Sequence, residues 1–124
     1  MKNFTLLREQ NEVLNKLSNK YKKLKEIVLS NIEFTSVDDL KSLLQMNIDS
    51  LNSKGSITIP GLQTQKELMT FFDANSDLID DVLADTDWFT KTPSQLDIHS
   101  VMVWITSAIE KALYQVIQTI INEL

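Results

Sequence analysis

Residues of the kinds that perform catalysis are scarce in this chain. It contains one histidine, His99, and no cysteine, which excludes thiol nucleophiles, thiolate metal sites and disulfides. Glycine loops that cradle phosphate between a strand and a helix are missing as well. Asp80 and Asp81 are adjacent and would point about 100° apart on a helix, which does not suit shared acid-base catalysis. We therefore expect a protein that is not an enzyme and holds no cofactor.

One acidic segment resembles the beginning of an EF-hand calcium loop. Asp73, Asn75 and Asp77 have the spacing of the first three oxygen ligands of such a loop. The rest of the pattern fails, because Leu78 replaces the glycine of the sharp turn and Ala84 replaces the bidentate glutamate. We expect an ordinary helix junction and no metal site at this position.

Acidic side chains are concentrated in one region of a chain whose formal net charge is −5. The aspartates of this region have no lysine or arginine among them, and they are Asp73, Asp77, Asp80, Asp81, Asp85 and Asp87. A solvated outer face is the ordinary interpretation. The alternatives are contact with a basic partner, or imitation of nucleic-acid phosphates in the binding groove of an enzyme. The candidate residues for such a contact are Asp77, Asp80, Asp81 and Asp85.

Basic side chains gather instead near the N-terminus, in a patch of Lys16, Lys20, Lys22, Lys23 and Lys25. Helical nucleic-acid binding requires more arginine, interleaved aromatic residues and a domain of net positive charge. Because this chain is acidic overall, we do not expect nucleic acid as its partner.

The stretch from residue 98 to residue 121 is the most apolar part of the sequence. Glu110 and Lys111 interrupt it, which leaves uncharged runs shorter than the roughly 18 residues that a membrane span requires. The sequence predicts a buried helix here and no membrane segment. The lack of cysteine is most compatible with a reducing cytoplasm.

One polar stripe runs along this apolar helix. At 100° per residue, its members fall within a sector of roughly 60°, and they are Ser100, Ser107, Lys111, Gln118 and Asn122. Trp104 lies in the middle of the stripe. A tryptophan surrounded by serines, a lysine and amides is typical of an interface anchor. Alternatively, the loop that contains Trp88 and Phe89, or the linker of Ile57 and Ile59, covers Trp104 within the chain. The candidate partner-binding residues are therefore Trp104, Ser100, Ser107 and Lys111.

The N-terminal quarter of the chain predicts one long amphipathic helix, from about residue 4 to residue 32. Neither glycine nor proline interrupts it, and the apolar residues Leu7, Leu14, Tyr21 and Val28 recur every seven positions. Packing inside the protein's own bundle is the favoured interpretation. The same spacing also suits a coiled-coil seam, which would join two copies as a homodimer.

Capping signals locate the remaining helices. Ser36, followed by two aspartates, predicts a helix over residues 37–52 with Gly55 as its stop. A capping box of Thr64 and Glu67 predicts a helix over 65–85, with a potential break near residue 75. Thr92 and the proline after it predict a helix over 93–123. Between the second and third helices, an extended linker should bury Ile57 and Ile59.

The sequence thus predicts an all-α, single-domain helical bundle of four to five helices, with long N-terminal and C-terminal helices. The two glycines and two prolines in 124 residues favour long helices over a sheet. Without catalytic or metal signatures, the expected function is a helical protein-protein interaction module, such as an adaptor, chaperone or inhibitor. One alternative is a structural homo-oligomer assembled through the first helix. Another is an acidic inhibitor that imitates nucleic acid, or a small-ligand binder.

Overall fold

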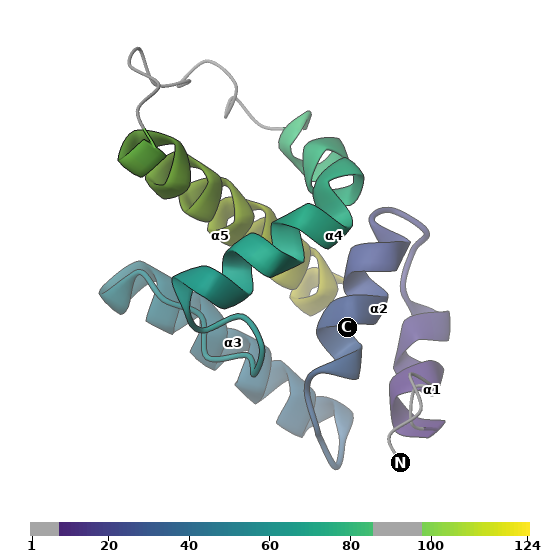
Figure 1. Cartoon of the computed structure of the whole chain (residues 1–124). Helices are drawn as coiled ribbons and strands as arrows, with labels where there is room; N and C mark the ends of the chain where they lie inside the picture. The colour runs from purple at the N-terminus through teal and green to yellow at the C-terminus, as the bar shows by residue number, and fades with distance from the viewer. Residues whose placement is uncertain (1–7, 86–97) are drawn as a thin grey trace, which may run out of the picture.

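The computed structural model of the chain describes residues 8–85 and 98–124 (Figure 1). These residues form five α-helices: α1 (Arg8–Lys16), α2 (Lys22–Ser30), α3 (Val37–Lys54), α4 (Gln65–Leu83) and α5 (Ile98–Glu123). Helices account for 77% of the described residues, which contain no strand. The prediction of an all-α helical fold is therefore confirmed.

Helix α5 is the central element of the fold, because α2, α3 and α4 all pack against it (Figure 1). Its inner face is apolar and inaccessible to solvent, and it consists of Ala108, Ile109, Ala112, Leu113, Val116, Ile117 and Ile120. Each large aliphatic side chain that is fully buried contributes about 1.5–3 kcal/mol to folding. The hydrophobic free energy of the core is therefore concentrated along this one helix.

The prediction of one helix from about residue 4 to residue 32 is wrong in its middle. The chain leaves α1 after Lys16 and begins α2 at Lys22, and the two helices pack against each other. Tyr21 ends the turn with a φ of 57°, a left-handed conformation that residues other than glycine rarely adopt. Turning back at this point brings Leu14 of α1 and Val28 of α2 into one core. Burial of apolar surface thus favours the break, although no glycine or proline marks it.

The heptad spacing consequently does not follow one continuous helix. Leu14 and Val28 are both buried inside the protein's own core, and Tyr21 is half-buried in the turn. Leu7 lies outside the described residues. The described seam residues therefore pack within one molecule, and a homodimer formed through this segment stays a prediction.

Gln10 occupies one of the inner positions of α1 and caps the end of α2. Its buried side-chain amide donates to the backbone carbonyl oxygens of Leu29, at 2.8 Å, and of Ile32, at 2.9 Å. The last carbonyls of a helix have no partner inside the helix, so such donors stabilise its end. A polar residue inside the core is therefore compensated by hydrogen bonds.

The predicted caps of α3 and α4 are confirmed. The Ser36 hydroxyl accepts from the backbone N–H of Asp39 at 3.1 Å, and Gly55 ends α3 in the left-handed conformation. Thr64 and Glu67 each accept a hydrogen bond from the other's backbone N–H, both at 3.1 Å. These contacts lie within four residues of chain, so local sequence decides where each helix begins.

The predicted break in α4 and the predicted linker are also present. Asn75 has a non-helical φ of −136°, and its side chain donates to the carbonyl oxygen of Phe71 at 3.0 Å. In the linker, Ile57 and Ile59 are buried as predicted. The buried side chain of Asn47 holds this linker against α3, since its oxygen accepts from both the backbone and the hydroxyl of Thr58.

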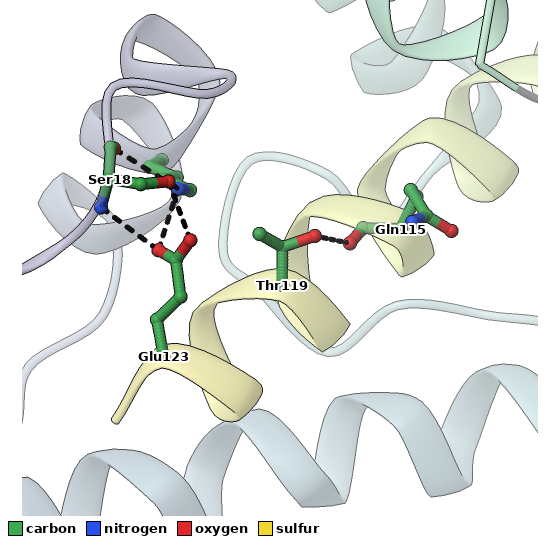
Figure 2. A network of polar contacts seen from close by, with 5 residues as sticks. Ser18, Gln115, Thr119 and Glu123 are labelled. Carbon is green, nitrogen blue, oxygen red and sulfur yellow. Dashed lines mark hydrogen bonds and ion pairs between the residues drawn. The ribbon is translucent and has the colours of Figure 1, made fainter.

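The predicted last helix is confirmed over the described part of the chain. It ends at Glu123, and its predicted start at residues 93–97 lies outside the described residues. The C-terminal end of α5 reaches the turn between α1 and α2 (Figure 2). Side chains thereby join the C-terminal end of α5 to the α1–α2 turn and to α2.

A buried ion pair makes this connection. The fully buried ammonium of Lys25 lies 2.8 Å from the Glu123 carboxylate, and it also donates to the hydroxyl and carbonyl oxygens of Ser18. Glu123 in turn accepts from the backbone N–H and the hydroxyl of Ser18, at 3.1 and 2.6 Å (Figure 2). The assignment of Lys25 to an exposed basic patch is therefore wrong. Its charge tolerates burial because three oxygen atoms surround it.

The same contacts shift the acidity of Glu123. Burial on its own would raise the pKa of this carboxyl, but hydrogen bonds from Lys25 and Ser18 outweigh burial and hold the pKa below its ordinary value. The carboxylate is therefore ionised over a wider pH range in the folded chain than in the unfolded chain. The ion pair persists at neutral pH.

Removal of Glu123 and removal of Lys25 should change the free energy of unfolding by different amounts. Lys25 is fully enclosed, whereas 25% of the Glu123 side chain is exposed. Glu123→Ala leaves an ammonium buried without its counter-charge and should cost about 3 kcal/mol of unfolding free energy. Lys25→Met fills the same space with an apolar chain and should cost about 1 kcal/mol or less, because Glu123 still reaches water. Urea denaturation measures both, with Lys22→Met, at an exposed position of α2, as the control. A larger loss for Lys25→Met would contradict this order.

The stability should also depend on pH through Glu123. Its pKa is lower in the folded chain, so ionisation stabilises the fold above the ordinary pKa, and this contribution is lost as the pH falls through the lowered value. We expect the difference between the wild type and Glu123→Ala to be largest near pH 7 and to shrink below about pH 4. Denaturation across this range tests the expectation. A difference that does not change with pH would count against the ionic contribution.

Candidate partner-binding surface

The outward face of α5 carries the polar stripe that the sequence predicted. Ser107 and Lys111 are exposed, and Ser100 and Trp104 are half-buried. All four predicted residues therefore lie on one helix, with none of them in the fully buried inner face. Cover of Trp104 by a partner stays a prediction. Trp88 and Phe89, which were offered as its internal cover, lie outside the described residues.

Val103 belongs to the same face, although the sequence interpretation did not include it. Its side chain is 48% exposed, so it adds apolar area beside the polar residues of the stripe. Val103, Ser107 and Lys111 follow one another at intervals of four, so they form one row along the helix surface. The helical angles used for the polar stripe could have located Val103, about 40° from Ser107.

A groove lies beside the end of this row, between α3 and α5. Its volume is about 380 Å³, and it is lined by Leu51, Asn52, Glu110, Lys111, Tyr114 and Gln115. It combines an apolar side chain, an aromatic ring, a carboxylate and an ammonium group. Such a mixture can bind a polar or charged group and also bury the apolar part of the side chain that carries it.

Glu110 is the electrostatically unusual residue of the groove. Its side chain is half-buried, and burial raises the pKa of its carboxyl. Among residues 8–85 and 98–124, no lysine, arginine or histidine lies within ion-pair distance of this carboxylate. Lys111 is next in the chain but points about 100° away around the helix. A half-buried carboxylate with a raised pKa that lines a groove is a candidate binding group.

The acidic candidates Asp77, Asp80, Asp81 and Asp85 are all exposed, in α4 and directly after it. They do not form an isolated negative face. Lys20 lies 3.5 Å from the Asp85 carboxylate. Asp81 lines one groove together with Lys22 and Lys23 of α2.

A tyrosine completes the contact between the α1–α2 turn and the end of α4. Tyr21 donates a hydrogen bond to Asp85, and the Lys20 ammonium lies 5.1 Å from the centre of the Tyr21 ring. Burial, followed by this hydrogen bond, raises the pKa of Tyr21 to about 12. The hydrogen bond from Tyr21 is the main cause that lowers the pKa of Asp85. Because about 60 residues of chain separate these groups, the sequence pattern gave no sign of the pairing.

The other sequence candidates lie in ordinary helical surroundings. Asp73, Asn75 and Asp77 belong to α4 and not to a loop. Within the described ranges, no three or more potential ligands are grouped so that they could hold a metal ion. His99 is exposed in the first turn of α5. None of the helices in the described part of the chain is both long and apolar enough to cross a membrane.

Comparison with protein-family models, with curated proteins and with solved structures finds no match for this chain. Its function is therefore inferred from the surface itself. The row of Val103, Ser107 and Lys111, with the adjoining groove, combines exposed apolar area, hydrogen-bonding groups and a half-buried carboxylate. We refer to the row and the groove together as the α5 surface.

The position of Glu110 should reduce the stability of the fold at neutral pH. Its pKa is raised in the folded chain, so the folded state is favoured below the ordinary pKa and loses stability as the pH rises through the raised value. Glu110→Gln should therefore stabilise the protein by about 0.5 kcal/mol near pH 7, with no gain below about pH 4. Denaturation at both pH values measures this. Glu26→Gln, a half-buried position of α2, controls for the loss of one negative charge, and a destabilised Glu110→Gln at neutral pH would contradict the assignment.

Proposed function

We propose that this protein is a non-enzymatic helical interaction module that binds another protein through the α5 surface. The observation that carries the proposal is the exposed row of Val103, Ser107 and Lys111 on the helix that fills the core. An aliphatic residue, a hydroxyl and a cation in one row give a partner both apolar area and hydrogen bonds. An adaptor, a chaperone or an inhibitor could each use such a surface.

The anchoring of α5 supports this proposal. Three helices pack against its inner face, so its outer face is held in a fixed orientation. A rigid surface loses little conformational entropy when a partner binds, which leaves more of the contact free energy for affinity. The α5 surface is thus suited to recognition without rearrangement of the fold.

The alternatives have less support. A homo-oligomer formed through the first heptads would need Leu14 and Val28 at its interface, and both side chains are buried in the core. An acidic inhibitor that imitates nucleic acid would need a continuous negative face. At the end of α4 that face is interrupted, because Lys20 lies against Asp85 and two further lysines lie beside Asp81.

Single substitutions of exposed apolar residues test the proposal. A partner is first recovered with the wild-type protein from its native host, and its affinity is then compared for Val103→Glu and Met46→Glu. Met46 on α3 is 59% exposed, so it is a matched control outside the α5 surface. Val103→Glu should weaken binding by about 10-fold or more, while both variants keep their stability within about 0.5 kcal/mol.

Three outcomes would contradict the proposal. Equal binding by both variants would remove the α5 surface from the interface. A loss of binding by Met46→Glu alone would place the interface on α3. Recovery of only a second copy of the chain, as a stable dimer in light scattering, would favour the homo-oligomer.

A further inference from the structure

The groove between α3 and α5 has the chemistry of a receptor for a single basic side chain. Its walls combine the carboxylate of Glu110 with the aromatic ring of Tyr114 and the aliphatic side chain of Leu51. Glu110 and Tyr114 are four residues apart on one helix, so their side chains are neighbours on its surface. A cation that enters the groove can therefore meet a carboxylate and an aromatic ring together.

The electrostatics of Glu110 indicate the sign of the ligand. Its carboxylate is half-buried, and burial raises its pKa. The described parts of the chain place no cation within ion-pair distance of this carboxylate. Bringing a positive charge to this position would offset the cost of partial desolvation. A negative ligand would not, and a neutral hydrogen-bond donor would do so less than a cation.

We propose that this groove binds an arginine side chain of the partner protein, with Glu110 as the carboxylate that receives the guanidinium group. The assignment rests on the proposed interaction module and identifies the chemistry of its partner. The guanidinium group forms two parallel hydrogen bonds to one carboxylate, and its plane stacks on an aromatic ring. Leu51 packs against the methylene groups of the arginine. A lysine ammonium fits less well, because it is more strongly hydrated and has no plane to stack on Tyr114.

Lys111 sets a second condition on the partner. It lines the same groove and is exposed, so it weakens the binding of the arginine itself and also repels any second basic side chain in the groove. The partner residue next to the arginine is therefore neutral or acidic. An arginine beside a neutral or acidic residue differs from a polybasic segment. A polybasic segment would bind the acidic residues of α4 in preference to the α5 groove.

A small arginine analogue tests the site without the partner. The probe is N-acetyl-arginine methylamide, titrated into the ¹⁵N-labelled full chain and followed through backbone amide chemical shifts. N-acetyl-citrulline methylamide, which has nearly the same shape and no charge, is the ligand control. The arginine probe should give saturable shifts at the amides of Glu110, Tyr114 and Leu51, with a dissociation constant on the order of millimolar. The citrulline probe should give no saturable shifts. The corresponding lysine compound, N-acetyl-lysine methylamide, should bind more weakly than the arginine probe.

Variants of the chain identify the receiving carboxylate. Glu110→Gln should weaken binding of the arginine probe by about 10-fold or more. Asp49→Asn, at an exposed carboxylate of α3 that does not line the groove, should leave binding unchanged. Lys111→Met should strengthen it, because a like charge is removed from the rim. Unchanged binding by Glu110→Gln, equal shifts with citrulline, or arginine shifts confined to the aspartates of α4 would each overturn the assignment.

The failure of this inference can be distinguished from failure of the proposed function. If Val103→Glu abolishes partner binding while the arginine probe gives no saturable shift, the interaction module stands and the arginine site is wrong. If the probe binds through Glu110 while Val103→Glu leaves partner binding intact, the arginine site stands and the row on α5 is not the interface.

Discussion

The rest of the fold depends on the removal of the inner face of α5 from water. Three of the other helices, α2, α3 and α4, pack on this face, and its fully buried positions are all aliphatic. The linker after α3 also turns Ile57 and Ile59 into the same core. Because hydrophobic burial has no preferred direction, it draws these elements together without fixing how they end. Polar contacts fix those ends.

The Lys25–Glu123 pair fixes the C-terminal end of α5. A helix terminus frays unless side chains or other elements hold it, and Glu123 is the last residue of α5. Its contacts with Lys25 and Ser18 attach it to α2 and to the end of α1. This ion pair contributes less to net stability than its Coulomb energy implies, because the Lys25 ammonium loses its hydration. The pair also holds the end of α5 against α2, since Glu123 supplies a counter-charge to the buried Lys25 ammonium.

The α5 surface is the part of the central helix that the bundle leaves uncovered. Its inner face supplies the hydrophobic core, and its outer face presents Val103, Ser107 and Lys111 to solvent. Glu110 is half-buried at the border between the two faces, in the groove that it lines together with Leu51 and Asn52 of α3. Burial raises the pKa of this carboxyl, and a perturbed carboxyl in a groove is a candidate binding group.

The sequence by itself determined the helical class, the caps at Ser36 and Thr64, the break at Asn75 and the burial of the linker. Each of these follows from contacts within about four residues of chain, or from apolar spacing along one element. Only the tertiary structure decided the turn at Tyr21, the burial of Lys25, the pairing of Lys20 with Asp85 and the groove around Glu110. These features depend on residues that are distant in sequence, such as Glu123 for Lys25 and Leu51 for Glu110. A local sequence pattern indicates whether a segment prefers a helix, a cap or a turn. The environment of a charged side chain depends instead on the distant segment that packs against it.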